Sequence, residues 1–399
     1  MSRAQLIEMA EHNLKYAQTG TIEQAEAILK VPADHYYDEG RWRLEMERVF
    51  KRMPLMLAAS AEIPNPGDYK AMDAVDTPVL ISRGGDGQVR AFINMCRHRG
   101  SQIMKAGTGN AKRFTCPYHA WSYDQSGALI GVYSEQDFGE VDRSCNSLVE
   151  LPAAERAGLI WVMINPNASL DIDTFLAGYD AVLDHFDFAN WHFFESRTLM
   201  GPNWKVAYDG YLDLYHLPIL HKDTFGSQFP NQALYYAWGP HQRVSSPDPS
   251  LGEYENLSKA SDAHLMAGVW TIFPHVSIAG FDGGGRGVMI SQLFPGETPL
   301  QSYTVQNYLM EKPPADEETA QAAHEQFKFL EYVVQEEDYA TGLRQQKALL
   351  TGAMPHVQFG RNEGGGQRFH AWVDRLLDTD DQALPALFQN GHANNGARQ

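Results

Sequence analysis

Short apolar runs separated by turn residues fill the stretch between about residues 58 and 165. Examples are residues 78–82 and 88–93, and Gly, Pro, Asn and Asp cluster in the turns around them. Runs of this length with mixed apolar and polar positions are typical of half-buried strands, and Gly next to Asp or Asn marks tight turns. We therefore predict a small antiparallel β domain over residues 51–165.

The rest of the chain mixes helical and strand patterns. Apolar positions at helical spacing over residues 3–30, interrupted at Gly20, and over residues 40–52 predict a helical lead, residues 1–50. Beyond it we expect a second, larger domain over residues 166–388 with helices near 171–186, 204–216 and 316–351 and strands near 268–280 and 286–294. Residues 389–399 are polar and rich in Gly and Asn, which predicts a loose tail. The fold class is therefore α+β.

Composition agrees with two globular domains. The chain has 399 residues, of which 43% are hydrophobic, and its net charge is −18. Such an acidic surface repels phosphate backbones, so we expect no nucleic-acid partner. The longest apolar runs have strand length and the N-terminus has no signal-peptide core, so we expect no membrane span and a cytoplasmic location.

Three cysteines are too few, and odd in number, for a disulfide framework in a reducing compartment. Two of them stand beside histidines in a C-x-H-x17-C-x2-H pattern: Cys96, His98, Cys116 and His119. Two thiolates and two imidazoles can hold a two-iron cluster, and imidazole ligation raises its reduction potential. A structural zinc site is the alternative, but zinc fingers rarely begin with C-x-H. We expect Cys145, which has no partner in the pattern, to be a small buried residue.

The flanking residues favour the cluster. Residues 94–100, N-M-C-R-H-R-G, and 116–121, C-P-Y-H-A-W, resemble the two ligand loops of the Rieske domain of ring-hydroxylating oxygenases, with Gly127 in the turn that follows. The resemblance implies a [2Fe–2S] cluster held by both Cys and both His residues. Ala120 replaces the glycine usual in that family, and we expect its methyl group to change little.

A second pair of histidines follows in the larger domain. His216 and His221 are five residues apart with Pro218 between them, and a proline that ends or kinks a helix can let the two rings converge. Two histidines and a distant carboxylate form the facial triad of O2-activating Fe(II) enzymes. On their own, paired histidines are more often ordinary core or surface residues.

The surrounding sequence resembles the catalytic motif of the same oxygenase family. Seven positions match N-W-K-x3-E-N-x2-D-x-Y-H-x4-H: Asn203, Trp204, Lys205, Asp213, Tyr215, His216 and His221. Asp209 and Gly210 replace the usual Glu and Asn. We expect Trp204 and Tyr215 to be packing residues.

The third iron ligand is expected far downstream. Glu336-Glu337-Asp338, with Gln346 eight residues after Asp338, resembles the family's E-D-x7-Q segment, which assigns Asp338 as the carboxylate ligand. A solvated acidic face is one alternative, and ligation by a neighbouring glutamate is another.

Asp213 lies three residues before His216, so both would share one face of a helix. A carboxylate there can accept the second N–H of His216 and orient it. The resemblance implies that Asp213 also bonds His119 of a neighbouring subunit, so that electrons cross between chains of a trimer.

The resemblance implies the alpha subunit of a Rieske non-haem iron oxygenase, working as a homotrimer with or without beta subunits. A separate ferredoxin or NAD(P)H reductase would supply electrons, because the sequence has no flavin or nicotinamide motif. The expected reaction is dihydroxylation of a hydrophobic aromatic compound with O2. A Rieske monooxygenase or demethylase, and an electron carrier without oxygenase activity, are the alternatives. Apolar residues 269–279, Tyr208, Phe225 and Phe229 are expected to line the substrate pocket.

Overall fold

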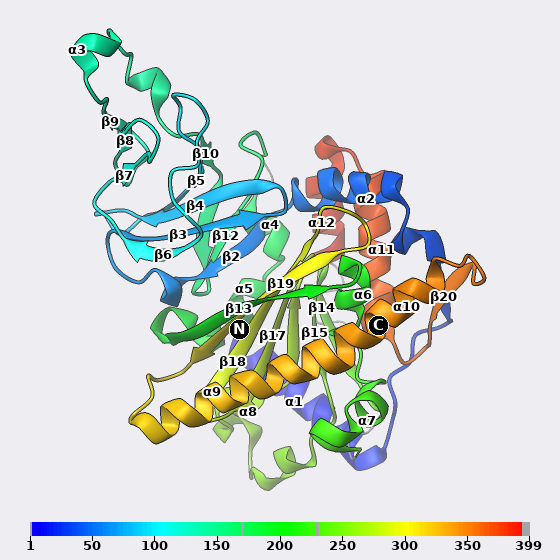
Figure 1. The fold of residues 1–399 in the computed structure, drawn as a ribbon. Helices are drawn as coiled ribbons and strands as arrows, with labels where there is room; N and C mark the ends of the chain where they lie inside the picture. Colours follow the sequence, from blue (N-terminus) through cyan, green and yellow to red (C-terminus); the bar gives the residue numbers. More distant parts are fainter. Residues whose placement is uncertain (1, 169–170, 228–230, 393–399) are drawn as a thin grey trace. The chain divides into compact units, whose positions relative to one another are not determined.

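The computed structural model describes residues 2–168, 171–227 and 231–392. They form two compact units: residues 1–49, 173–187 and 191–399 make up unit 1, and residues 50–172 with 188–190 make up unit 2. Each unit has its own sheets and its own core (Figure 1). The mixture of helices with antiparallel sheets confirms the predicted α+β class.

Unit 2 is built from short antiparallel strands. A five-stranded sheet has the order β10-β5-β4-β3-β6, and two three-stranded sheets have the orders β11-β12-β2 and β7-β8-β9. The strands are β2 (Leu55–Ala59), β3 (Asp68–Ala74), β4 (Thr77–Arg83), β5 (Val89–Ile93), β6 (Gly107–Asn110), β7 (Phe114–Thr115), β8 (Ser122–Tyr123), β9 (Leu129–Gly131), β10 (Glu150–Leu151), β11 (Ala153–Arg156) and β12 (Leu159–Val162). The helices are α3 (Glu135–Phe138) and the 3-10 turns η3 (Ser60–Glu62), η4 (Ser144–Asn146) and η6 (Phe188–Asn190).

The core of unit 2 forms beneath the two cysteine loops. Leu80, Phe92, Phe114 and Tyr123 are buried together with both loop cysteines. Gly127 has φ +82°, and a Cβ there would lie 2.5 Å from the Phe92 ring, so only glycine fits this turn.

Unit 1 is organised around a seven-stranded antiparallel sheet of order β13-β19-β18-β17-β16-β15-β14. Its strands are β13 (His192–Gly201), β14 (Leu234–Trp238), β15 (His241–Ser245), β16 (Val269–Ile272), β17 (Val276–Asp282), β18 (Arg286–Pro295) and β19 (Ser302–Met310), and β1 (Leu29–Pro32) pairs separately with β20 (His356–Phe359). Residues 268–280, expected as one strand, form two strands, β16 and β17, with residues 273–275 between them.

Helices lie over both faces of this sheet. They are α1 (Ser2–Thr19), α2 (Glu39–Glu45), α4 (Ile172–Leu176), α5 (Tyr179–Leu183), α6 (Trp204–Asp209), α7 (Leu217–Leu220), α8 (Asp262–Leu265), α9 (Glu317–Tyr332), α10 (Ala340–Leu349), α11 (Gly364–Asp378) and α12 (Leu384–His392). π-Helical segments are η2 (Met46–Phe50), η7 (Lys222–Gly226) and η10 (Val333–Tyr339), and 3-10 turns are η1 (Ala33–Tyr36), η5 (Asp184–Phe186), η8 (Pro249–Glu253), η9 (Leu257–Lys259) and η11 (Asp381–Ala383).

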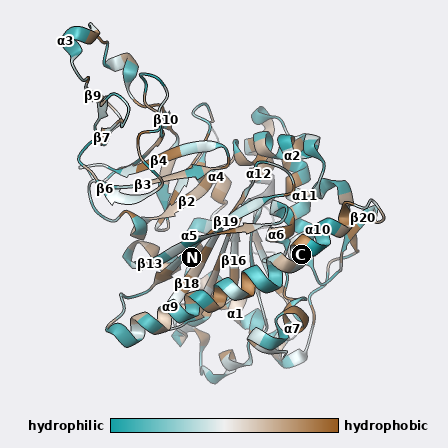
Figure 2. Cartoon of the chain, in the orientation of Figure 1, coloured by the Kyte–Doolittle hydropathy of each residue, from teal (hydrophilic) through white to brown (hydrophobic). Residues whose placement is uncertain are grey.

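The rod formed by α9, η10 and α10 crosses one face of the sheet (Figure 1). Phe327 and Leu330 of α9 pack against Tyr308 and Met310, while the outward side of the rod is largely hydrophilic (Figure 2). This packing fixes η10 relative to the sheet, and η10 carries the acidic residues that matter below.

Several expected boundaries shift. The first helix ends at Thr19, at the interruption expected at Gly20, and residues 21–30, expected to be helical, are not. The helix expected over 171–186 is split into α4, α5 and η5. Part of the expected tail, Gln389–His392, is helical, and residues 393–399 lie outside the described part. No helix of the described residues has the length and apolar character to cross a membrane.

Candidate metal centres

Three potential metal ligands from two distant segments of unit 1 converge. Nε2 of His221 lies 3.2 Å from Oδ1 of Asp338, and Nε2 of His216 lies 3.8 Å from the same oxygen. One donor atom from each residue lies within 4.8 Å of the other two. Two imidazoles and a carboxylate at this separation could bind one metal ion from one side, which is the donor set that suits non-haem Fe(II).

The two histidines flank the short helix α7. Their ring centroids are 5.1 Å apart. Pro218 lies in the first turn of α7, where its missing N–H removes no helical hydrogen bond. The expected helix over 204–216 is therefore wrong beyond Asp209, and Pro218 starts a new helix instead of kinking an old one.

Asp213 contacts His216, but through a turn and not across a helix face. Its Oδ1 accepts hydrogen bonds from the backbone N–H groups of Tyr215 (2.6 Å) and His216 (3.1 Å) and lies 3.0 Å from Nδ1 of His216. Such an Asx-type turn fixes both the backbone and the ring. Nε2 of His216 is thereby directed toward Asp338.

Glu337 holds the other histidine from behind. Its Oε2 lies 2.7 Å from Nδ1 of His221 and accepts a 2.8 Å hydrogen bond from Thr224 Oγ1. The His221 ring therefore stands between two adjacent carboxylates, with Asp338 at Nε2. Glu337 and Asp338 both belong to the π-helical turn η10, a kind of turn that is frequent at functional sites.

The acidic surroundings change the proton affinity of both rings. Burial lowers the pKa of His216, but Asp213 and Asp338 outweigh it, so the pKa is raised overall. For His221 the same balance holds, with Asp338 and Glu337 raising the pKa. The carboxylates thus make both imidazoles more basic, which strengthens them as metal ligands.

A cavity of about 410 Å³ opens beside the three residues. Its wall is largely apolar and, among the described residues, contains no Lys or Arg; it includes Leu214, Leu217, Phe225, Val269, Ala279, Phe281, Leu330, Val333, Val334, Val357 and Phe359. Of the expected pocket residues, Val269, Ala279 and Phe225 do line it. Tyr208 is fully buried beneath the sheet and does not, and Phe229 lies outside the described residues.

Asp209, at the family's usual Glu position, anchors the cavity wall. Its Oδ2 accepts a 2.8 Å hydrogen bond from Tyr36 and its Oδ1 lies 3.0 Å from Nε2 of His370. Tyr36 and His370 are both buried, so Asp209 joins the N-terminal segment, α6 and α11. Sequence reasoning missed this network, because nothing near residues 36 or 370 marks them as partners of Asp209.

The remaining motif residues support the fold around the site. Lys205 is fully buried, and its Nζ lies 2.7 and 2.5 Å from the two carboxylate oxygens of Glu45, which also accepts from Trp204 Nε1. Burial lowers the pKa of Lys205. Asn203 caps α6, and its backbone N–H donates to Gln346. Tyr215 is 53% exposed, so the packing role expected for it is wrong within this chain.

The cysteine–histidine pattern forms two loops of the same geometry in unit 2. The N–H of Cys96 donates to the carbonyl of Ser101, and the N–H of Cys116 to that of Trp121, each over 2.8 Å. In each loop the residue four positions after the cysteine, Gly100 or Ala120, has positive φ and donates back to the cysteine carbonyl. The closed loop holds Ala120 at φ +57°, a left-handed conformation that is strained for alanine but not for glycine, so its methyl group is not neutral as expected.

The four side chains fit a cluster. Both cysteines are buried and lie close enough for their thiol groups to interact. The His98 and His119 rings lie 4.7 Å apart, and His98 Nδ1 is buried without a hydrogen-bond partner, as an atom that ligates iron would be. Tyr123 places its hydroxyl 3.3 Å from Cys96 Sγ. Cys145, expected to be buried, is exposed, because it sits in a surface turn with Asp142.

Comparison with protein families gives two adjacent matches. Residues 53–141 match the Rieske [2Fe–2S] domain, and residues 188–379 match the catalytic domain of the ring-hydroxylating alpha subunit. The chain belongs to the Rieske oxygenase alpha-subunit family. It therefore combines a [2Fe–2S] domain with a catalytic domain of the type that binds mononuclear iron.

Relatives within this family include two reaction types. The chain is 36% identical over 192 residues to the benzene 1,2-dioxygenase alpha subunit of Pseudomonas putida, covering 45% of this chain and 42% of that one. It is 30% identical over 213 residues to the glycine betaine monooxygenase oxygenase subunit of Chromohalobacter salexigens, covering 53% and 47%. The alignments thus span less than half of these curated relatives.

Solved structures of the family share the fold. Naphthalene 1,2-dioxygenase from Rhodococcus sp. superposes with a TM-score of 0.70 at 22% identity, over 95% of this chain and 100% of that chain. A quaternary ammonium Rieske monooxygenase with L-carnitine superposes with a TM-score of 0.72 at 18% identity, over 90% and 97%.

Proposed function

We propose that this chain is the terminal oxygenase component of a multicomponent Rieske oxygenase. The observation that carries the proposal is the convergence of His216, His221 and Asp338 beside an apolar cavity. The cysteine–histidine loops would hold the cluster that stores an electron, and the three converging residues would hold the iron at which O2 reacts. An electron carrier needs only the loops, so the triad argues against that alternative.

In this proposal Cys96, His98, Cys116 and His119 hold the cluster, and His216, His221 and Asp338 hold Fe(II), which supplies O2 binding and activation. Asp213 and Glu337 keep the two imidazoles in the tautomers whose Nε2 atoms face the metal. Asp213 would also bond His119 of a neighbouring chain in a homotrimer, with or without beta subunits. Leu214, Phe225 and the other apolar wall residues exclude water around the substrate.

We propose further that a ferredoxin or NAD(P)H reductase delivers the electrons and that the reaction is dihydroxylation of a hydrophobic aromatic compound. The apolar wall and the relationship to benzene 1,2-dioxygenase support this. Mono-oxygenation or demethylation with the same metals is the second candidate, since glycine betaine and carnitine monooxygenases are also relatives. We assign residues 51–165 to the cluster domain and 166–388 to the catalytic domain, with 1–50 packing on the latter.

The test is a single turnover of the chemically reduced protein with labelled O2 and a panel of aromatic compounds. Two labelled atoms in one product establish dihydroxylation, whereas one labelled atom or loss of a methyl group moves the reaction to the second candidate. The His216→Ala variant is the control and should retain the cluster spectrum without forming product. Cluster oxidation without product from any compound would mean that the proposed substrate class is wrong or that the chain only carries electrons.

A further inference from the structure

The cavity beside the three proposed iron ligands, which we call the catalytic cavity, is bordered by two glycines of the described residues, Gly210 and Gly342. Packing requires glycine at residue 342, because a Cβ there would lie 2.9 Å from Pro202 Cγ and 3.0 Å from Val206 Cγ1. At Gly210, apart from its chain neighbours, a Cβ would have a single atom of the described residues within 4 Å, the carbonyl oxygen of Ala207 at 4.0 Å. A side chain at residue 210 would therefore enter open space at the cavity wall.

The backbone does not require glycine at residue 210 either. Gly210 follows α6 with φ −62° and ψ −23°, an ordinary right-handed helical conformation that every L-residue adopts. In this conformation glycine is less favourable than alanine, because it loses more conformational freedom on folding. Neither the backbone nor the packing of α6 thus accounts for a glycine where the resembling family usually has Asn.

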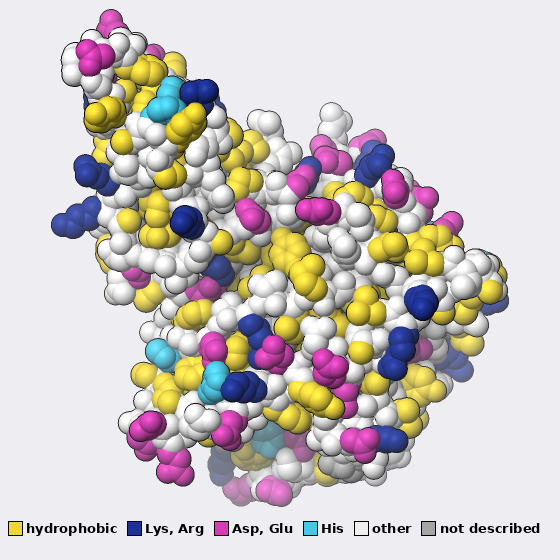
Figure 3. Space-filling model, viewed as in Figure 1, with side chains coloured by type: hydrophobic (Ala, Val, Ile, Leu, Met, Phe, Trp, Pro, Cys, Tyr) yellow, Lys and Arg dark blue, Asp and Glu magenta, His cyan; other side chains and the backbone are white. Residues whose placement is uncertain are grey.

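The surroundings of Gly210 suit an apolar group. Val206, one turn earlier on the same side of α6, also lines the catalytic cavity. The carboxylate of Asp209 is already engaged by Tyr36 and His370, so its oxygens are not free to bind a polar substrate group. Hydrophobic side chains on the face seen in Figure 3 are interspersed with charged ones, whereas the cavity wall is largely apolar. An apolar substrate is therefore better held inside this cavity than on that face.

We infer that Gly210 is a specificity-determining residue and that the space beside it receives a second ring of the substrate. The ring that reacts lies beside His216, His221 and Asp338, and a ring fused to it lies over Gly210. The volume of about 410 Å³ is within the usual range of small-molecule sites. This inference rests on the proposed function and narrows its substrate class from hydrophobic aromatic compounds in general to fused two-ring compounds.

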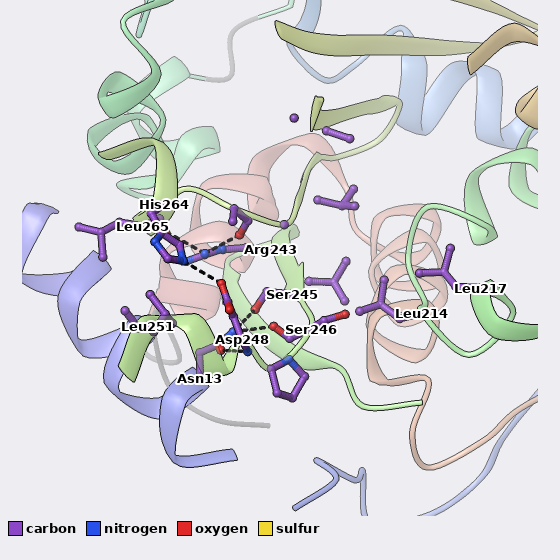
Figure 4. A pocket seen from close by; sticks show the side chains of 18 of the residues that line it. Asn13, Leu214, Leu217, Arg243, Ser245, Ser246, Asp248, Leu251, His264 and Leu265 are labelled. Atoms are coloured by element: carbon purple, nitrogen blue, oxygen red, sulfur yellow. Dashed lines mark hydrogen bonds and ion pairs between the residues drawn. The ribbon is translucent and has the colours of Figure 1, made fainter. Parts of the chain in front are cut away.

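A neighbouring cavity is the alternative place for a second ring. It has a volume of about 550 Å³, and Leu214 and Leu217 line it as well as the catalytic cavity. Figure 4 shows these two leucines on one side of the space and Asp248 and His264, which lie 2.8 Å apart, on the opposite side. Gly210 is not part of its wall. A substitution at Gly210 therefore changes the catalytic cavity and not the neighbouring one.

The test compares naphthalene with benzene as ligands of the full-length holoprotein without O2. Naphthalene binding is followed by its fluorescence, and benzene binding by competition with naphthalene. Any apolar site binds the larger hydrocarbon more tightly, so the informative quantity is the change of each affinity in a variant. Gly210→Leu should lower naphthalene affinity about tenfold or more, as misfitting methylene groups do in an apolar pocket, and should leave benzene affinity unchanged. Gly210→Ala should show the same selectivity with a smaller loss.

Gly280→Leu is the matched control. A Cβ at Gly280 would also have a single listed neighbour of the described residues, the carbonyl oxygen of Gly287 at 4.0 Å, but Gly280 borders the neighbouring cavity and not the catalytic one. It should keep both affinities. Circular dichroism and the cluster spectrum verify folding, and Gly210→Ala decides if Gly210→Leu does not fold. Unchanged naphthalene affinity in the Gly210 variants, an equal loss of benzene, or a loss of naphthalene in Gly280→Leu instead would overturn the inference.

Binding and turnover separate this inference from the proposed function. A selective loss of naphthalene affinity in Gly210→Leu, without oxygenated product from the wild-type protein, would support the role of Gly210 and count against the proposed reaction. Oxygenated product from benzene, together with naphthalene binding that does not depend on Gly210, would do the reverse.

Discussion

Replacing Glu337 by Gln tests how the second histidine is held. The change keeps the size of the side chain but removes the charge that faces His221 Nδ1 at 2.7 Å. The Glu337 carboxylate orients the His221 ring and makes its Nε2 more basic. Loss of this negative charge should therefore weaken mononuclear iron binding about 10- to 100-fold. That factor corresponds to about 1.4–2.7 kcal/mol of binding free energy.

The assay is competition for Fe(II) between the protein and a chromophoric chelator, with the cluster's visible spectrum as an internal measure of intact protein. Asp338→Asn removes a proposed ligand and should lower affinity more than Glu337→Gln. Glu336→Gln is the matched control, because Glu336 is exposed and adjacent in sequence, and it should bind iron normally. If Glu337→Gln lost more iron than Asp338→Asn, Glu337 would be the ligand, and an unchanged affinity would refute the orienting role.

Three further predictions concern the supporting structure. Ala120→Gly should raise the free energy of unfolding of the cluster unit by about 1 kcal/mol, because it relieves a left-handed backbone; chemical denaturation followed at the cluster absorbance measures it, and no gain would count against the strain. Glu45→Gln should lower stability by about 3–5 kcal/mol by leaving the buried Lys205 ammonium unpaired, and a denaturant midpoint unchanged from wild type would contradict that pairing. Tyr123→Phe should lower the cluster's reduction potential by removing the hydroxyl beside Cys96 Sγ; protein-film voltammetry measures it, and an equal or higher potential would disprove the contact.

The convergence of the proposed cluster ligands could be predicted because the sequence signal for it is local. Cys96 with His98 and Cys116 with His119 lie within single loops, so their spacing alone limits the geometry. The fold class followed for the same reason, since strand and helix periodicities are properties of short windows. The strain at Ala120 was missed, because a positive φ follows from how the loop closes on the cysteine.

The iron triad was harder to predict, because its third residue comes from a distant element. Family resemblance selected Asp338, but pattern alone could not separate it from Glu337. In the structure the two carboxylates lie at different nitrogens of His221, Asp338 at Nε2 and Glu337 at Nδ1, which supports Asp338 as the proposed ligand. The π-helical turn that carries both residues has no reliable sequence signal. The backbone conformation of residues 210–216 was also missed. A helix was expected there, whereas the structure has an Asx-type turn at Asp213.

Hydrogen-bond partners that lie 160 to 173 positions apart left no signal in the sequence. Asp209 meets Tyr36 and His370, and Glu45 meets Lys205, only because the N-terminal segment, α6 and α11 pack together.

The most direct test of the central claim is Mössbauer spectroscopy of reduced protein reconstituted with enriched iron. The account predicts a high-spin mononuclear Fe(II) signal in addition to the signals of the [2Fe–2S] cluster. In His216→Ala the mononuclear signal should disappear while the cluster signals persist. A mononuclear signal that is unchanged in His216→Ala, or absent from the wild-type protein, would contradict the assignment of His216, His221 and Asp338 as the iron site.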